Sequence, residues 1–320
     1  MTPRIESGEI VYSIMVAATA FRDGLATIAP WRLGAGERVA PYMFLLPAFA
    51  LVSAVSFLPL GFAVVQSFFR SDYLELGRFI GISNYGDYLY GRGGPGFVWN
   101  SLVYCGATVA IALPLGFLLA LVLNENLPLR GTLRTLLILP WLVSNLIGAL
   151  LWGWLGNPQY SPVIHALRQV GLSAPDMVTN KHAAMTAVVL CNAWASYPLV
   201  MVFVLAALQT VPKELLESAQ IDGASGLQRF RHVTFPIVSN TTMVALVLTT
   251  LHAFKNVEII LLMTGGGPVG ATETMAIRVF QEGFQFFRMG VASSGAVVVF
   301  LVNVLFTLAF IRVLRGESST

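Results

Sequence analysis

The stretch that decides the fold runs from Ser101 to Leu123 and reads SLVYCGATVAIALPLGFLLALVL. It carries no charged residue, and it is long enough to cross the hydrocarbon core of a bilayer, which takes about 20 apolar residues in a helix. Backbone polar groups in lipid must form hydrogen bonds within the protein, so a single apolar segment is expected to be helical. The stretch therefore predicts a transmembrane helix.

Five more stretches are also apolar and long enough to be candidate spans. In the first of them, Pro47 and Pro59 and a length beyond the bilayer thickness predict a tilt, a kink or an interfacial turn. The fifth span of the chain is the most polar, so it is expected to face the bundle rather than lipid. Together they predict an all-α membrane protein with six spans, the other five being Val39 to Phe69, Leu133 to Leu155, Ala183 to Leu208, Ile237 to Phe254 and Met289 to Leu314.

The composition agrees with lipid as the outer solvent. Of the 320 residues 56% are hydrophobic and 11% are charged, and the mean hydropathy is +0.74, whereas a soluble domain carries about 25% charge. The net charge of +3, without a run of like charge, gives no sign of a nucleic-acid partner. Cys105 and Cys191 lie in apolar runs and are expected to be buried thiols, and the histidines show no metal-ligand spacing.

Residues 1–38 and 315–320 flank the six-span region, residues 39–314. The apolar stretch from Ile10 to Phe21 is too short to span and lacks the features of a secretory signal, so residues 1–38 are interpreted as a cytoplasmic or interfacial leader, with a disordered tail as the alternative. Of the 19 Lys and Arg residues, 11 fall on the side that holds both termini. This bias predicts that the N- and C-termini are cytoplasmic.

The longest polar interruption on that side is residues 209–236, which are predicted to form a helical hairpin. Pro212 suits the start of a helix over Lys213 to Ile221, Gly223 can take the left-handed conformation that ends it, and Ser225 can cap the next helix. An apolar face on this hairpin indicates a protein partner, although a helix lying on lipid is an alternative. That face comprises Leu215, Leu216, Ala219 and Phe230.

The same loop resembles the Glu-Ala-Ala loop of ABC-importer permeases, in particular the carbohydrate-uptake branch. The matching residues are Glu217-Ser218-Ala219, then Gly223, then Val233-Thr234-Phe235-Pro236, at the family's spacing. Ser218, Val233 and Phe235 depart from the usual Ala, Ile and Leu. The resemblance implies that the hairpin docks in a cleft of a cytosolic ATPase dimer, through Glu217, Ser218, Ala219, Asp222, Gly223, Phe235 and Pro236.

The ATP site is expected on that partner. None of the lysines, Lys181, Lys213 and Lys255, lies in a G-x-x-x-x-G-K-[ST] motif. The resemblance therefore implies that this chain holds no cofactor of its own and that ATP and Mg²⁺ bind to the ATPase.

A second resemblance follows the fifth span. Residues 254–268, from Phe254 to Pro268, are similar to a segment of maltose-type permeases that is characteristic of the larger of two permease subunits, with Glu258 in place of the usual Asp and Val257 in place of the usual Phe. The resemblance implies a second, homologous permease and an extracytoplasmic solute-binding protein close to this outer loop. The binding-protein contact would comprise Gly265, Gly266, Gly267 and Pro268, which could otherwise be a flexible Gly-rich turn.

The cargo is expected to be a sugar or oligosaccharide, with glycerol phosphate or a polyol as the alternative. Sugars are held by planar hydrogen-bonding groups and by aromatic rings in a largely apolar wall. Lys255 and His252 are the only basic groups close by, which favours a neutral sugar. The candidate cargo residues, any of which could instead serve packing, are Asn192, Trp194, Ser196, Tyr197, His252 and Asn256.

Two other classes of protein are weighed against this reading. A membrane-embedded enzyme would need a catalytic motif, and neither H-E-x-x-H nor G-x-S-x-G occurs. An ion-driven carrier would place acidic residues in the membrane, and the six stretches contain no Asp or Glu. The chain is therefore expected to be a transport subunit of a bacterial inner membrane and not an enzyme.

Overall fold

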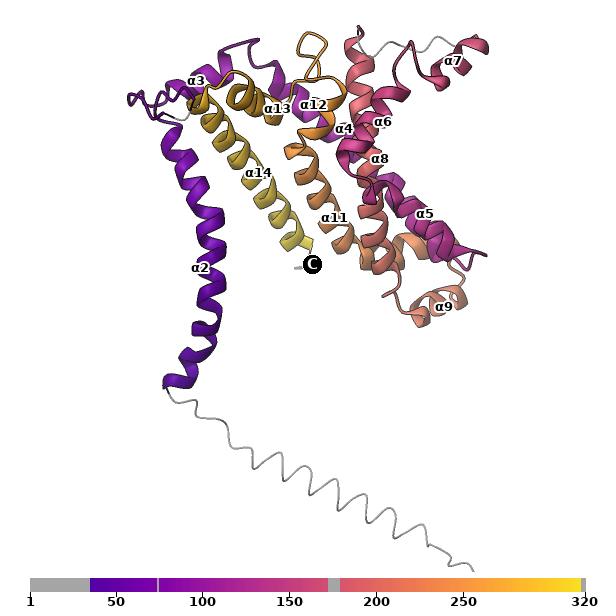
Figure 1. Cartoon of the computed structure of the whole chain (residues 1–320). Helices are drawn as coiled ribbons and strands as arrows, with labels where there is room; N and C mark the ends of the chain where they lie inside the picture. Colours follow the sequence, from indigo (N-terminus) through magenta and orange to yellow (C-terminus); the bar gives the residue numbers. More distant parts are fainter. Residues whose placement is uncertain (1–34, 74, 172–178, 318–320) are drawn as a thin grey trace, which may run out of the picture. The chain divides into compact units, whose positions relative to one another are not determined.

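A computed structural model describes residues 35–73, 75–171 and 179–317 (Figure 1). Within these ranges the regular structure is helical, apart from one isolated bridge between Phe69 and Phe79. Most of the predicted leader, residues 1–34, and residues 318–320 of the tail lie outside the described residues. The chain divides into a unit that ends at Leu60 and a unit that begins at Gly61 and contains most of the helices.

Among the described residues, five helices are long and apolar enough to cross a membrane, and a bent pair makes a sixth span if it is counted as one. The all-α membrane fold predicted from the sequence is therefore confirmed. The long helices are α2 (Ala35–Gln66), α4 (Gly96–Asn124), α8 (Lys181–Leu208), α11 (Phe235–Lys255) and α14 (Met289–Glu317). The shorter ones are α3 (Ser83–Tyr90), α5 (Arg130–Leu142), α6 (Asn145–Leu155), α7 (Pro162–Gln169), α9 (Lys213–Ile221), α10 (Gly226–Arg229), η1 (Phe230–Thr234), α12 (Glu258–Met263), α13 (Met275–Phe280) and η2 (Gln281–Gln285).

The third predicted span is the bent pair. Helices α5 and α6 meet at an angle of 92° across a short break. Pro140, inside α5, has no N–H to donate to the preceding turn, and α5 ends two residues later at Leu142. Val143 is extended, with φ −73° and ψ 129°, and α6 starts at Asn145. The span is thus broken where proline weakens the helical hydrogen bonds.

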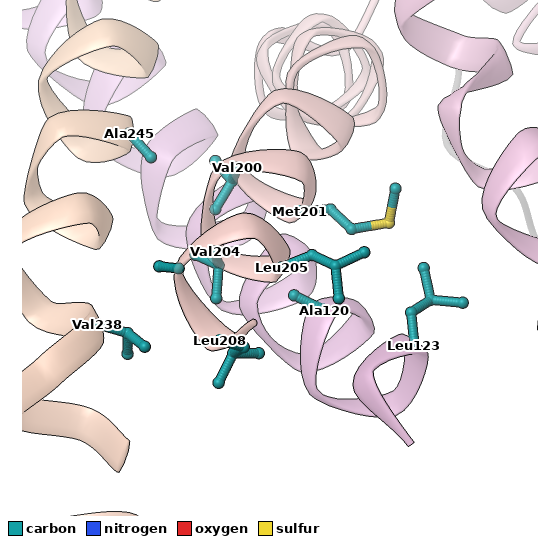
Figure 2. Close-up of a cluster of buried hydrophobic side chains, with 10 residues drawn as sticks. Ala120, Leu123, Val200, Met201, Val204, Leu205, Leu208, Val238 and Ala245 are labelled. Carbon is teal, nitrogen blue, oxygen red and sulfur yellow. The ribbon is translucent and has the colours of Figure 1, made fainter. Parts of the chain in front are cut away.

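Helices α4 and α8 form the central seam of the unit that begins at Gly61, and α11 packs beside them. Gly116 marks the closest approach, because a Cβ atom added there would lie 2.6 Å from the carbonyl oxygen of Tyr197. Small residues let membrane helices approach in this way. Figure 2 shows an apolar cluster between these helices, with Ala120 and Leu123 from α4, Val200, Met201, Val204, Leu205 and Leu208 from α8, and Val238 and Ala245 from α11.

The helix bundle of this unit has two ends that carry different elements. Helix α9 lies at one end, which we call the hairpin end, whereas α3, α7, α12 and α13 gather at the other, which we call the cap end (Figure 1). The two loops singled out in the sequence therefore lie at opposite ends of the bundle.

Candidate coupling hairpin, cargo residues and cap-end loop

The predicted hairpin is present over residues 213–234. Helix α9 begins after Pro212 and ends in a left-handed Gly223 with φ +79°. Two hydrogen bonds close the turn, from the Gly223 amide to the Gln220 carbonyl and from the Ala224 amide to the Ala219 carbonyl, which is the Schellman pattern. Ser225 then caps α10, and its own amide donates to the Gln228 side chain in a capping box. The predicted local roles of Gly223 and Ser225 are confirmed.

The second arm of the hairpin and the span after it form one continuous helix. Helix α10, the π-turn η1 and α11 form one helical run from Gly226 to Lys255, so the helix is not interrupted at Pro236. Proline lacks the N–H that an α-helical turn would use, and it is tolerated near a helix start. The wider π-turn precedes it, with the Phe235 amide donating to the Phe230 carbonyl. The hairpin thus continues directly into a span.

The charged and polar residues assigned to ATPase coupling lie on the outside of the hairpin. Glu217, Ser218 and Asp222 are exposed, whereas Ala219 is half-buried. The two arms are joined by a hydrogen bond of 3.0 Å from the Arg229 guanidinium to the Gln220 amide oxygen. A hollow of about 350 Å³ lies beside the turn, lined by Ala219, Asp222, Gly223, Ala224, Gln228, Arg229, His232 and Val233.

The apolar face of the hairpin is partly different from the predicted one. Leu215 is 48% exposed, but Leu216, Ala219 and Phe230 are half-buried against the protein itself. The most exposed apolar side chains are Ile221 at 87% and Leu227 at 77%, on either side of the turn. The predicted face included neither residue, because exposure on either side of a turn depends on how the two arms pack.

An aromatic cluster joins the hairpin to the bundle. The ring centroid of Phe117 on α4 lies 6.0 Å from that of Phe230 and 6.4 Å from that of Phe235, and the last two rings are 6.0 Å apart. Phe235 is assigned to coupling by the sequence, whereas Phe117 gave no signal within its apolar stretch. The cluster places side chains of the hairpin and of α4 in direct contact.

The α8 candidates for cargo binding lie at and near the α4–α8 seam. Asn192 is fully buried, and its amide nitrogen donates to the Thr108 hydroxyl over 3.4 Å. The amide oxygen of Asn192 and the hydroxyls of Ser196 and Tyr104 are buried without a hydrogen-bond partner in the described part of the chain. Unpartnered buried polar atoms are uncommon, so two groups on α8 and one on α4 can still take a hydrogen bond.

The aromatic candidates of α8 contact different neighbours. Trp194 is half-buried beside Trp152 of α6, with ring centroids 6.2 Å apart. Tyr197 is 7% exposed and packs with Ala112 and Ala193. These contacts are compatible with packing as well as with cargo binding.

The α11 candidates occupy the cap end of that helix. His252 is half-buried, whereas Asn256 is buried and its amide oxygen accepts from the Ile259 backbone, which caps α12. Among the described residues, no hydrogen bond or ring contact joins these two side chains to the α8 candidates. The structure therefore joins Asn192 to Thr108, but it does not assemble all six candidates.

The residues assigned to binding-protein contact form a hydrogen-bonded loop after α12. Gly265 and Gly266 have φ of +60° and +92°, which suits glycine, and the Gly267 amide donates to the Thr264 carbonyl. A hollow of about 490 Å³ lies between this loop and α6. Its wall includes Gly265, Gly267, Pro268, Trp154 and Asn157.

A buried ion cluster beside this loop gave no signal in the sequence. The side chains of Arg278 and Glu282 are each 1% exposed. The Arg278 guanidinium lies 4.4 Å from the centroid of the Phe97 ring and 3.7 Å from the Glu273 carboxylate, and Glu282 lies 3.3 Å from Arg288. Burial raises the pKa of Glu273, and the neighbouring Arg278 opposes that rise. The cluster fixes α13 and η2 to the rest of the cap end.

Residues 112–315 match the family described as "Binding-protein-dependent transport system inner membrane component". The chain is 32% identical over 279 residues to the sn-glycerol-3-phosphate transport system permease protein UgpA of Brucella abortus, covering 85% of this chain and 93% of that protein. It is 30% identical over 275 residues to the trehalose/maltose transport system permease protein MalF of Thermococcus litoralis, covering 86% and 93%.

A solved structure has the same fold. It is a bacterial ABC transporter involved in the import of the acidic polysaccharide alginate, with a TM-score of 0.77, 23% identity, and coverage of 88% of this chain and 96% of that chain. The family match, the two relatives and the helical architecture agree over most of the sequence. The chain therefore belongs to the family of binding-protein-dependent transport system inner membrane components.

Proposed function

We propose that this chain is the larger of two homologous permease subunits in an ATP-driven importer that carries a neutral sugar or oligosaccharide. The observation that carries the cargo assignment is the set of neutral, unpartnered polar atoms on and beside α8, the Asn192 amide oxygen and the Ser196 and Tyr104 hydroxyls. Neutral donors and acceptors in an apolar wall suit a sugar, whereas a phosphate calls for cations. In α8 and α11 the lysines are Lys181 and Lys255, near the cap ends of the helices.

Names of relatives support a polar organic cargo and leave glycerol phosphate as the alternative. Relatives at 30 to 32% identity are named as permeases for sn-glycerol 3-phosphate and for trehalose and maltose. The identities are too similar to separate these two cargo classes. The neutral polar groups of the candidate cargo region support the neutral sugar.

The hairpin is proposed to couple this subunit to a cytosolic ATPase dimer, where ATP and Mg²⁺ bind. Support comes from the exposed Glu217, Ser218 and Asp222 and from the exposed apolar side chains of Ile221 and Leu227. A polar rim around apolar side chains is typical of a protein interface. The remaining contacts of the proposed docking surface are Ala219, Gly223, Phe235 and Pro236.

The hairpin end is then cytoplasmic, and the cap end faces an extracytoplasmic solute-binding protein, with Gly265 to Pro268 close to it. One solved relative by fold is described as an alginate ABC transporter in complex with alginate pentasaccharide-bound periplasmic protein. The proposed topology puts both termini in the cytoplasm of a bacterial inner membrane, in agreement with the bias of Lys and Arg.

The coupling role is tested with substitutions at the hairpin. Glu217→Arg and Gly223→Val should each abolish ATP-driven uptake and weaken co-purification of the ATPase, while the permease still inserts. Glu214→Arg, also on exposed α9, and Gly223→Asn, which tolerates a left-handed φ, serve as matched controls and should retain uptake. Full uptake by both Glu217→Arg and Gly223→Val would contradict the coupling role.

The cargo is tested in proteoliposomes that contain the complete importer and its binding protein. Radiolabelled maltose, trehalose and sn-glycerol 3-phosphate are supplied separately, and ATP-dependent accumulation is measured. We expect accumulation of a neutral disaccharide, reduced by Asn192→Leu, which removes a buried amide. Accumulation of glycerol phosphate alone would overturn the assignment to a neutral sugar.

A further inference from the structure

The loop at residues 264–274, which we call the braced loop, has an internal hydrogen-bond framework. The hydroxyls of Thr264 and Thr272 lie 2.7 Å apart, and the Thr272 hydroxyl donates to the Gly267 carbonyl over 2.8 Å. The Thr272 amide donates to the Gly266 carbonyl over 3.2 Å. The base of the loop is therefore closed by its own side chains.

Side chains from other elements brace the loop from outside. The amide nitrogen of Asn100, on α4, donates to the carbonyls of Gly270 and Glu273 over 2.9 and 3.0 Å. Gln281 donates to the Gly265 carbonyl over 3.0 Å, and Arg92 in turn donates to Gln281 over 2.8 Å. A loop held in this way loses little conformational freedom when a partner binds it.

The tip of the braced loop presents Val269. Its side chain is 89% exposed, the largest exposed fraction among the large apolar residues whose exposure the structure describes. Val269 and Gly270 have φ of +51° and +72°, and the Ala271 amide donates to the Pro268 carbonyl over 3.0 Å, as in a tight turn with two left-handed residues. Such positions usually hold Gly, Asn or Asp, and a β-branched residue there is strained.

Neither packing nor turn geometry within the chain accounts for valine at this position. Strained residues that persist are concentrated at binding and switch regions. Val269 is apolar and exposed, and the cap end near it carries the partly exposed charged side chains of Arg92 and Glu273. A single exposed apolar side chain near charged groups suits an interface with a water-soluble protein. A lipid-binding helix would instead have a broad apolar face.

We propose that Val269 is an anchor residue that inserts into the surface of the extracytoplasmic solute-binding protein, and that Asn100 is a positioning residue for it. The partner is inferred from the family, whose members depend on a binding protein, and from the place of the loop at the end opposite the coupling hairpin. The proposal rests on the proposed topology, in which the cap end is extracytoplasmic. It does not depend on which cargo is carried.

Two substitutions at Val269 separate binding from folding. Val269→Asp replaces the apolar contact with a charge, and Val269→Gly removes the contact while relieving the strained φ. Each should raise the Kd of the cargo-loaded binding protein for the nanodisc-embedded importer roughly tenfold. Val269→Gly should leave the melting temperature unchanged or higher, an outcome that a merely structural role would not give.

Val170 provides the matched control. It is also a valine of the cap end, 72% exposed at the end of α7, and its φ is an ordinary −90°. Val170→Asp and Val170→Gly should bind the binding protein within twofold of the wild type. Kd values for the Val269 variants that stay within the same twofold would overturn the proposal.

A double-mutant cycle tests the positioning role of Asn100. Asn100→Ala removes both hydrogen bonds to the loop and should raise Kd several-fold, but it should add nothing in the Val269→Gly background, because the residue acts through Val269. Additive effects would overturn the positioning role. If Val269→Asp instead prevents assembly with the second permease, that permease is the occupant and the proposal is wrong.

The proposed function and the anchor role of Val269 are contradicted by different results. If the wild-type importer accumulates no solute with ATP and does not bind its binding protein, the proposed function fails. If the wild type transports and binds normally while the Val269 variants match it, only the anchor role fails.

Discussion

Replacing Gly116 by alanine should force α4 and α8 apart. A Cβ atom at this position would lie 2.6 Å from the Tyr197 carbonyl oxygen, 2.7 Å from the Val200 Cβ and 3.0 Å from the Met201 amide nitrogen. Ordinary contacts to a methyl group are about 3.5–4.0 Å. Two of the three atoms belong to the α8 backbone and cannot rotate away, so the helices must separate.

Two opposing free-energy terms set the change in stability caused by Gly116→Ala. Alanine is favoured over glycine inside a helix by about 1 kcal/mol, whereas overpacking a close contact costs about 1–3 kcal/mol and more where backbone atoms clash. We expect a net loss of about 2 kcal/mol, which corresponds to a fall in melting temperature of roughly 3 °C for a chain of this size. The lost stability weakens the α4–α8 seam, which places Asn192 against Thr108.

Gly106 provides the control on the same helix. A Cβ atom added there meets nothing within 4 Å, so Gly106→Ala should leave the melting temperature unchanged or raise it. Both variants are heated in detergent, and the folded fraction is followed by fluorescence-detected gel filtration. A Gly116→Ala protein that melts at or above the wild-type temperature would refute the close-contact argument.

Two further predictions concern side chains that join elements. Phe117→Ala removes the α4 ring that contacts Phe230 and Phe235. We expect ATPase activity to persist while ATP-dependent uptake falls several-fold. A proportional loss of ATPase activity and uptake would argue against a coupling role for the aromatic cluster. Arg278→Met removes a fully buried guanidinium that contacts Phe97 and Glu273, and hydrogen bonds and ion pairs of buried charged groups contribute about 1.5–3 kcal/mol. We expect the melting temperature of Arg278→Met to be several degrees below that of the wild type. Arg278→Lys should restore it only partly, because lysine lacks the planar guanidinium. An unchanged melting temperature in Arg278→Met would contradict this.

The spans and the hairpin turn could be predicted because their signals are local. A long uncharged stretch is sufficient for a membrane helix, and the conformational freedom of Gly223 and the capping ability of Ser225 depend on neighbouring residues alone. The continuous run through Pro236 was not predicted, because proline usually indicates a boundary. A π-turn accommodates it here.

The features that the sequence did not reveal depend on long-range contacts. Arg278 and Glu282 look like ordinary loop charges until the fold buries them, and Asn100 lies far along the chain from the loop that it braces. Val269 is one apolar residue in a Gly-rich segment, and its exposure and left-handed φ are visible only in three dimensions. The candidate cargo residues stay predictions, although the buried polar atoms near Asn192 agree with that assignment.

The absence of a break between the hairpin and α11 has a mechanical consequence. Gly226 to Lys255 is a single helical run. The second arm of the hairpin is the short end of this run, and α11 is the long end that crosses the bundle. The run can therefore act as a lever. The far end stops at Asn256, which caps α12, the helix that leads into the braced loop. A small tilt imposed on the hairpin would therefore reach the opposite face of the membrane as a displacement of α12, without any intervening joint in α11.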